Sequence, residues 1–388
     1  MKFFVIIISV MFCINMWSKL SIHHKSASVI DLDSMEYEAM SGAGGCYQAT
    51  SVLRNFVQKD NKFILIDYEY SPTITLHKGN YIGTYESPCS ESEKEFDKVV
   101  VMVNRFDVFN IYEMFHSLIN TYILLKLFSL EGDNFTILFV DDAERTALND
   151  DMFGVFTSDL VYGDKKTCYK FKKGVLKSSA EFTSILVTKH GVLKGRGSNH
   201  HCRSALLREF VSVVKDHFGV PHDDGHYLKK EGGPSIIWSS RGVHRRGNSV
   251  KEYKPSRMLL DEDKFLNALR KSTGHSITSI DFGHLTAEQS IRVVSGADIM
   301  IGMHGAGLMW SAFLPRHGGL VEIFGADRGP HNRHYHNVAS LSDLHYSDIR
   351  PGSLLTVARN LKWNGGKTFL RQVIESVEQV KNPEEEPT

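Results

Sequence analysis

The sequence predicts an α/β protein with two domains, the second of which is built around a parallel sheet. Short apolar runs at residues 235–238, 276–280, 298–301 and 320–324 alternate with amphipathic segments, a pattern typical of βαβ units. At 388 residues the chain is also too long for a single core of ordinary size. Its 45 basic residues balance 45 acidic ones, so the composition indicates no general attraction to nucleic acid or to a membrane surface.

The first 25 residues are typical of a signal peptide, or of a signal anchor followed by a short stem. Lys2 precedes an apolar run at residues 3–17, which is short for a membrane span and lacks a clear small-residue cleavage site. In either case we expect the remainder to lie in the lumen of the endoplasmic reticulum or Golgi. The protein would be cleaved there, or held by a single N-terminal anchor.

Four cysteines and one sequon bear on the same compartment. In an oxidising lumen the thiols can form two disulfides in any of three pairings, or they can remain buried thiols. Asn134-Phe-Thr136 is a glycosylation sequon and agrees with a lumenal setting. The cysteines are Cys46, Cys89, Cys168 and Cys202.

Composition places the boundary between the two lobes at residues 222–233, where glycine, proline and charged residues collect. The first lobe is then residues 26–225 and the second is residues 234–365. A final amphipathic helix at residues 366–382 is expected to pack back across the two lobes. The acidic end of the chain, residues 383–388, is expected to be a disordered tail.

The first lobe has fewer regular signals than the second. Three apolar runs predict strands and two longer periodic segments predict helices. The predicted strands are residues 98–103, 136–140 and 184–187, and the predicted helices are residues 109–128 and 203–218. The second of these helices has apolar residues at helical spacing along one face, which predicts packing against a core.

Helix boundaries in the second lobe are marked by capping residues. Asp261 can cap a helix that has acidic residues in its first turn, basic residues near its end and Gly274 beyond. Thr286 begins a capping box, and the helix that follows it stops at Gly296. These helices lie between the predicted strands, as a parallel sheet requires.

The loop after the strand at residues 298–301 is the most informative segment. Its sequence, Gly302-Met-His-Gly-Ala-Gly307, precedes a helix expected at residues 308–314. The glycines leave the backbone uncrowded, so amide hydrogens can point at an anion at the positive end of that helix, and His304 adds a side-chain donor. The spacing matches neither the P-loop nor the dinucleotide fingerprint, so an ordinary βα turn remains the alternative to a phosphate site.

Two further features accompany the loop. Glu322 lies inside an apolar strand, where a carboxylate needs partners such as the hydroxyls of a ribose, unless it is an edge residue facing water. Arg241 follows the first strand of the lobe, at the strand end where α/β sheets gather ligand groups. Arginine forks and helix ends can neutralise a diphosphate leaving group without a metal. Further arginines follow at Arg245, Arg246 and Arg257.

Taken together, residues 291–308, 313–315 and 321–324 resemble the C-terminal half of glycosyltransferase family 61. The resemblance is close over residues 235–346 and faint over residues 110–220. Within it, residues 256–263 are similar to the arginine-containing segment that follows the family's first arginine strand. This similarity favours Arg241 and Arg257 as the family arginines and puts Arg245 and Arg246 in an insertion.

The resemblance implies a GT-B fold, in which two Rossmann-like lobes face a central cleft. It also implies an inverting transfer with no metal or other cofactor. The donor would be a nucleotide sugar, most simply UDP-N-acetylglucosamine with UDP-xylose as the alternative, and the acceptor a hydroxyl of a protein or protein-linked glycan. Glu322 would hold the ribose, and Asp281 or Phe282 the uracil. The implied donor-binding residues are Arg241, Arg257, Asp281, Phe282, His304, Gly305, Ala306, Gly307 and Glu322.

The catalytic base is expected in the first lobe. Residues 110–120 resemble the helix start of the family in which an asparagine precedes a histidine. The family usually has an aspartate four residues after that histidine, whereas this chain has Asn120. An amide cannot accept the proton, so either the base is His116 or Glu113, with His116 the first choice, or activity is impaired.

Other chemistries fit the sequence less well. Asp31 and Asp33, and the pair Asp141 and Asp142, imitate the acidic pair with which metal-dependent transferases hold manganese, but such pairs are also ordinary loop and cap residues. Several histidines suggest zinc, yet their spacing matches no zinc motif. They are His200, His201, His331, His334, His336 and His345. A serine hydrolase would need a Gly-x-Ser-x-Gly elbow, which the sequence lacks.

A binding protein of the same fold is the alternative from a different class. Asn120 favours a lumenal protein that binds a nucleotide sugar or glycan and has lost turnover. Live donor chemistry is favoured instead by the presence of all the expected donor-site residues, for which an idle site has no need: Arg241, His304, Gly305, Gly307 and Glu322.

Overall fold

The computed structural model describes about three fifths of the chain. The described segments are residues 73–76, 82–84, 92–105, 107–127, 130–141, 143–163, 167–171, 175–179, 204–222, 233–242, 244–245, 252–253, 257–325, 333–350, 356–357, 360–363 and 365–382. The predicted N-terminal signal or anchor, the strand at residues 184–187 and the C-terminal tail lie outside them. So do Cys46, Cys89 and Cys202. Among the helices that the structure describes, none is both long and apolar enough to cross a membrane.

The chain divides into two compact units, Met1–His200 and His201–Thr388. The first contains a four-stranded parallel sheet in the order β6-β5-β4-β8. Helix α3 follows β4 and helix α4 follows β5, so the connections are those of a Rossmann-like βαβ arrangement. The elements are β4 (Val99–Asn104), α3 (Ile111–Leu127), β5 (Phe135–Phe139), α4 (Ala147–Gly154), β6 (Leu160–Tyr162) and β8 (Val175–Ser179), with a short 3₁₀ helix at Gly132–Asn134.

A second, mixed sheet in this unit has the order β2-β1-β7-β3. Phe96 and Tyr169 from it pack with Val100, Met102 and Leu138 of the parallel sheet, so one apolar cluster joins the two sheets. The strands are β1 (Thr73–Leu76), β2 (Ile82–Thr84), β3 (Ser92–Phe96) and β7 (Thr167–Phe171). The predicted strands at residues 98–103 and 136–140 correspond to β4 and β5, each shifted by one residue.

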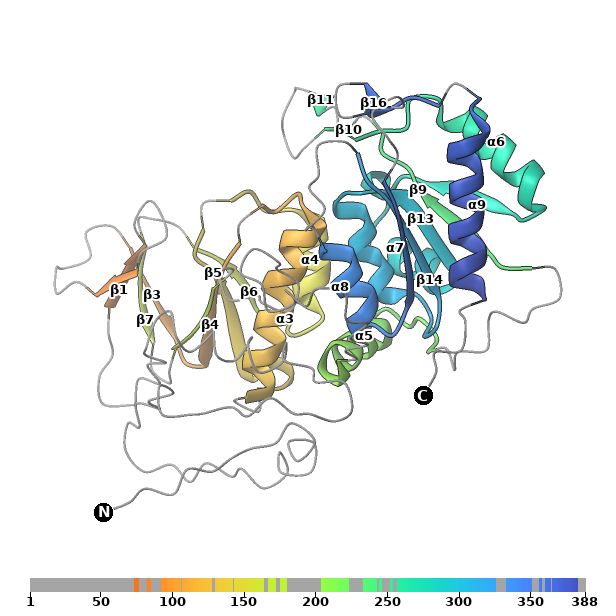
Figure 1. Ribbon diagram of the computed structural model, residues 1–388. Coiled ribbons are helices and arrows are strands. Elements are labelled where there is room, and N and C mark those ends of the chain that lie inside the picture. The colour runs from red at the N-terminus through yellow and green to blue at the C-terminus, as the bar shows by residue number, and fades with distance from the viewer. Residues whose placement is uncertain are drawn as a thin grey trace, which may run out of the picture. The chain divides into compact units, whose positions relative to one another are not determined.

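The second unit is a doubly wound sheet of five parallel strands in the order β12-β9-β13-β14-β15. Figure 1 shows α6 and α9 on one face of this sheet and α7 and α8 on the other. The strands are β9 (Ile236–Ser239), β12 (Ile277–Ile280), β13 (Ile299–Met303), β14 (Gly319–Ile323) and β15 (His345–Ile349). All four strands predicted for this lobe are present, and β15 is one that the prediction lacked.

The helices of the second unit are α5 (Ala205–His217), α6 (Glu262–Thr273), α7 (Ala287–Ser295), α8 (His334–Leu341) and α9 (Lys367–Lys381). Two-stranded ribbons pair β10 (His244–Arg245) with β11 (Glu252–Tyr253) and β16 (Thr356–Val357) with β17 (Asn360–Leu361). Short 3₁₀ helices are η6 (Phe282–His284) and η7 (Ala306–Phe313). The helix expected at residues 308–314 is therefore a 3₁₀ helix that begins two residues earlier.

The ends of α6 and α7 have most of the caps predicted from the sequence. Thr286 and Gln289 form the expected reciprocal capping box of α7, and Gly274 ends α6 in the left-handed conformation, with φ of 71°. Asp261 is the N-cap of α6, but its side chain makes no capping hydrogen bond. The capping box and the glycine at the end of α6 depend only on residues that are close in the sequence, so the sequence predicts both.

Two segments group differently from the predicted lobes. Helix α5, assigned from sequence to the first lobe, lies in the second unit: Ser204 N donates to Leu341 O at 2.9 Å, and Arg292 Nη2 donates to Phe218 O at 2.6 Å. Helix α9 packs its apolar face into the core of the second unit's own sheet. That core combines side chains of β9, β13 and β14 with those of α6 and α9, and it makes the sheet a rigid platform for the loops at its edge.

Candidate active site

The glycine-rich loop lies in the sheet of the second unit, at the point where the order of the strands reverses. The chain passes from β9 outward to β12 and then returns to β13 on the other side of β9, so β9 and β13 form the switch point of the sheet. In open α/β sheets, ligands bind outside the carboxyl ends of the strands at this point. The carboxyl end of β9 leads to Arg241, and that of β13 leads to His304 and Gly305. Arg241 and the glycine-rich loop, which the sequence predicted as parts of one site, therefore meet at the same edge of the sheet.

Arg241 lies directly on the loop. Its Nη1 donates to the backbone oxygen of His304 at 3.2 Å. A Cβ placed on Gly305 would be 1.3 Å from that Nη1, so only glycine leaves room for the guanidinium here. The first amides of η7 follow at Ala306 and Gly307, at the end of the helix where unpaired N–H groups point outward. A guanidinium and a helix N-terminus side by side are a ready anion-binding combination.

The side chains of His304 and Glu322 are turned toward each other beneath the loop. Glu322 is fully buried and His304 is 4% exposed. One carboxylate oxygen of Glu322 contacts His304 Nδ1, and the other accepts a hydrogen bond of 2.5 Å from the Tyr346 hydroxyl. Each oxygen of Glu322 thus has one protein partner, and the predicted contact of this residue with a ribose stays a prediction. His304 likewise presents its backbone, more than its ring, to the loop surface.

Burial controls the protonation of this carboxylate. It raises the pKa of Glu322 from its ordinary value of 4.5 to about 8, the Tyr346 hydrogen bond opposes the rise, and Asp348 adds to it. Two arginines, Arg257 and Arg350, pull the pKa in the downward direction. Burial also raises the pKa of the Tyr346 hydroxyl well above its usual range, with the charge of Glu322 adding to that rise.

Arg350 was not identified from the sequence. It follows β15 as Arg241 follows β9, and its guanidinium lies 3.8 Å from the centre of the Phe324 ring. Phe324 in turn stacks on His304, with ring centres 5.1 Å apart. Arg350 and Arg257 both lower the pKa of Glu322 through their charge. A strand prediction for residues 345–349 would have put Arg350 at this edge.

The predicted uracil contacts lie at the next strand end. Asp281 follows β12, and its two oxygens accept from Gly283 N at 3.0 Å and Gly242 N at 3.1 Å. Asp281 thereby holds Gly242, the residue next to Arg241, in place. Phe282 is half-buried and stacks on Trp310 with ring centres 6.1 Å apart, and a Cβ added to Gly307 would lie 3.9 Å from the Phe282 ring. An aromatic ring at that position can stack on a planar base.

The predicted catalytic residues lie in the first unit, on α3. His116 is 3% exposed and Asn120 is fully buried. Glu113 is more accessible, with 28% of its side chain exposed, and its Oε2 lies 3.7 Å from His116 Nδ1. Asn110 begins the helix, since its Oδ1 accepts from Tyr112 N at 3.1 Å. Glu113 and His116 thus form a pair in the first turns of α3, and Asn120 lies deeper in its packed face.

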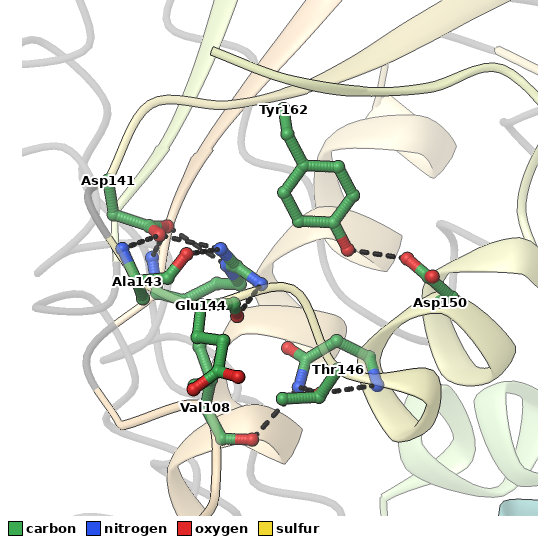
Figure 2. A network of polar contacts seen from close by, with 9 residues as sticks. Val108, Asp141, Ala143, Glu144, Thr146, Asp150 and Tyr162 are labelled. Atoms are coloured by element: carbon green, nitrogen blue, oxygen red, sulfur yellow. Dashed lines mark hydrogen bonds and ion pairs between the residues drawn. The ribbon is translucent and has the colours of Figure 1, made fainter. Parts of the chain in front are cut away.

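The acidic pair at Asp141 and Asp142 was the stronger metal alternative. Asp141 forms a buried ion pair with Arg105, whose Nη2 and Nε donate to its two oxygens at 2.7 and 3.0 Å. Figure 2 shows this network, which extends through Ala143 and Glu144 to the loop before α4. Because Arg105 occupies both oxygens, Asp141 acts as a loop anchor here. Asp142 lies outside the described residues.

Several of the histidines considered for zinc pack against aromatic rings. His334 lies 6.2 Å from His304 between ring centres, His336 is edge-on to Tyr346 at 5.0 Å, and His345 lies 6.1 Å from His317. In the part of the chain that the structure describes, no three histidine, cysteine, aspartate or glutamate side chains group as a metal site. His200, His201 and His331 are not among the described residues.

Comparison with known proteins decides the family. The sequence model of the family described as Glycosyltransferase 61 matches residues 94–321, more than half of the chain. The chain belongs to glycosyltransferase family 61. The match covers both units, from β3 to β14, so the resemblance inferred from the loop and the arginines is confirmed. The predicted α/β class with two Rossmann-like units is confirmed as well.

Named relatives are similar at low identity. Mouse EGF domain-specific O-linked N-acetylglucosamine transferase is 25% identical over 195 residues, which cover 50% of this family 61 chain and 32% of the mouse protein. Human protein O-linked-mannose beta-1,4-N-acetylglucosaminyltransferase 2 is 33% identical over 121 residues, covering 30% and 21%. The protein of the latter name from Takifugu rubripes is 22% identical over 271 residues, covering 64% and 42%. The chain thus spans less than half the length of these relatives.

Among solved structures, E. coli heptosyltransferase WaaC with ADP is similar to this chain with a TM-score of 0.33 and 9% identity. The alignment covers 73% of this chain and 99% of the heptosyltransferase.

Proposed function

We propose that this family 61 glycosyltransferase moves N-acetylglucosamine from UDP-N-acetylglucosamine to a hydroxyl of a protein or protein-linked glycan, with inversion at the anomeric carbon. The two named groups of relatives are N-acetylglucosaminyltransferases, which supports this choice of donor sugar. Their names also support a protein or glycoprotein acceptor, and with it a setting in the lumen of the secretory pathway. UDP-xylose is the alternative donor.

The observation that carries the proposal is Arg241 lying on Gly305 at the switch point of the second sheet. A diphosphate seated there would meet the guanidinium of Arg241 and the first amides of η7. These groups stabilise the negative charge that develops on the leaving UDP as the glycosidic bond to the donor breaks. Arg350 follows β15 at the same edge, where its Nη2 is paired with Asp348 at 2.8 Å, and Arg257 is the further arginine proposed for the donor. Positive charge from the protein itself is the basis for proposing a transfer that requires no metal.

The base is proposed to be the pair of Glu113 and His116. One of them removes the proton from the acceptor hydroxyl as its oxygen attacks the anomeric carbon, and the UDP leaves with the bonding electrons. Glu113 is the more exposed member, and its Oε2 lies 3.7 Å from His116 Nδ1, so the two candidate bases lie side by side. Asn120 cannot take this role because an amide does not accept a proton at neutral pH.

The proposal is tested by binding and turnover together. Calorimetry with UDP, UDP-N-acetylglucosamine and UDP-xylose is expected to rank the N-acetylglucosamine donor first, with affinity unchanged by EDTA. Arg241→Ala should abolish measurable binding while the circular dichroism spectrum stays unchanged. Equal affinity of Arg241→Ala and wild type would contradict the site.

Hydrolysis of the donor without acceptor separates enzyme from binding protein. A live transferase is expected to release free sugar slowly, and Glu113→Gln should reduce that release without weakening UDP binding. A chain that binds the donor but never turns it over, with or without a protein acceptor, would instead be the binding protein that Asn120, in place of the family's usual aspartate, favours.

A further inference from the structure

Three side chains form a continuous hydrogen-bonded path under the glycine-rich loop. The Tyr346 hydroxyl donates to one oxygen of Glu322 at 2.5 Å, and the other oxygen contacts His304 Nδ1. The backbone of His304 continues the path, since its N–H donates to Ile323 O at 2.8 Å and its oxygen accepts from Arg241 at 3.2 Å. The path therefore runs from β15 through β14 to the loop after β13 and ends on the arginine of the site.

Burial makes this path rigid. Glu322 is fully buried, and His304 is held between the Phe324 ring at 5.1 Å and the Tyr335 ring at 5.3 Å. A buried carboxylate that loses one of its partners is left with an unsatisfied oxygen, which is costly in an apolar interior. Each member thus fixes the position of the next.

We propose that Glu322 and Tyr346 are positioning residues, which act through His304 to hold the glycine-rich loop and Arg241 in the arrangement that receives the diphosphate. This inference rests on the proposed function of the same edge. It gives Glu322 an indirect role in addition to the predicted contact with the ribose, and it adds Tyr346, which the sequence did not indicate.

The charged groups around the path predict how UDP affinity depends on pH. Glu322 faces His304 from the loop, Tyr346 and Asp348 from β15, and the arginines Arg257 and Arg350. Because burial raises the pKa of Glu322 to about 8, the carboxyl is protonated at neutral pH and loses its proton above that value. The charge that then appears must be accommodated by shifts of His304 and the loop. UDP affinity is expected to fall as the pH rises through about 8.

The test uses the full chain and three variants. Glu322→Gln keeps the size of the side chain but cannot titrate, and Tyr346→Phe removes only the hydroxyl. Ser347→Ala is the matched control, because Ser347 is the next residue of β15 and bonds Gln379 of α9 at 3.0 Å, away from the path. UDP affinity and the kcat and KM of donor hydrolysis are measured from pH 6.5 to 9.5, with thermal unfolding as the check of folding.

The expected result separates the variants by pH as well as by affinity. Tyr346→Phe should weaken UDP binding about ten-fold and raise KM more than it lowers kcat, a change equal to about 1.4 kcal/mol. Glu322→Gln should make UDP affinity independent of pH around 8, while Ser347→Ala follows the wild type. If Tyr346→Phe does not fold, the pH dependence of UDP affinity in Glu322→Gln tests the proposal by itself.

Two outcomes would overturn different claims. If Glu322→Gln and the wild type lose UDP affinity in parallel as the pH rises, Glu322 does not control the loop and the positioning role is wrong. If the wild type binds no UDP or UDP-sugar at any pH, the proposed function itself is wrong.

Discussion

Gly305 is where the loop and the arginine of the site come closest. Its own φ of 167° is extended backbone open to any residue, so the need for glycine is steric. A methyl group there would lie 1.3 Å from Arg241 Nη1 and 2.6 Å from its Cζ. Only the flexible end of one arginine has to move, so the fold is expected to survive the substitution while the binding geometry is lost.

Gly305→Ala is therefore predicted to weaken UDP binding about ten-fold or more, with little change in thermal stability. Calorimetry measures the affinity, and Gly296→Ala at the end of α7 is the control, because a methyl group there meets only ordinary contacts at 3.5 Å or more. In an Arg241→Ala background Gly305→Ala should cost little further affinity. A full additional loss in that background would show that Gly305 acts independently of Arg241.

At the scale of elements, the loops at the strand ends of the first sheet are held by the ion pair of Arg105 and Asp141. The two side chains are 1% and 7% exposed, and the guanidinium also lies 4.5 Å from the Phe139 ring and 5.1 Å from the Tyr162 ring. Tyr162 donates to Asp150 at 2.5 Å, as Figure 2 shows, and ties α4 to the same cluster. Removing one partner leaves the other charge buried without its counter-ion.

Arg105→Met is accordingly predicted to destabilise the protein by about 3–5 kcal/mol. Urea unfolding of the full chain, followed by circular dichroism, measures the loss. Lys98→Ala is the control: the ion pair of Lys98 and Asp159 is 41% and 34% exposed, so its removal should cost no more than about 1 kcal/mol. Equal effects of the two substitutions would mean that burial of the Arg105 pair adds nothing to stability.

At the scale of the whole molecule, the buried carboxyl of Glu322 links folding to pH. Its pKa is about 8 in the folded protein against an ordinary value of 4.5, so the folded state binds the proton more tightly than the unfolded state. The stabilisation is complete below about pH 4.5 and is lost as the pH rises through about 8. In Glu322→Gln the amide does not titrate and this contribution is constant.

The difference in free energy of unfolding between wild type and Glu322→Gln is thus predicted to shift against the wild type from pH 5 to pH 9. Urea unfolding at each pH gives the two curves, whose separation isolates this group from all others that titrate. Curves that stay parallel over the whole range would show that Glu322 has the same proton affinity in the folded and unfolded states.

The sequence by itself determined the family, the class and the local features. Apolar periodicity gave β9, β12, β13 and β14 to within two residues, and the capping box and Gly274 marked helix ends, because these depend on neighbours in the chain. The glycine-rich loop and Arg241 were also identifiable, since each follows a strand. Strand β15 was missed because its sequence, His345-Tyr-Ser-Asp-Ile349, is mostly polar and takes its strand form from pairing with β14.

Only the tertiary structure decided what the site residues touch. A carboxylate in an apolar strand needs a partner, and the sequence could not say whether that partner was a ligand or Tyr346, 24 positions away. Sheet pairing places Glu322 beside Gly302 and Asp348, and its buried side chain contacts His304. Such contacts depend on strands that are distant in the chain, so spacing along the sequence does not encode them directly.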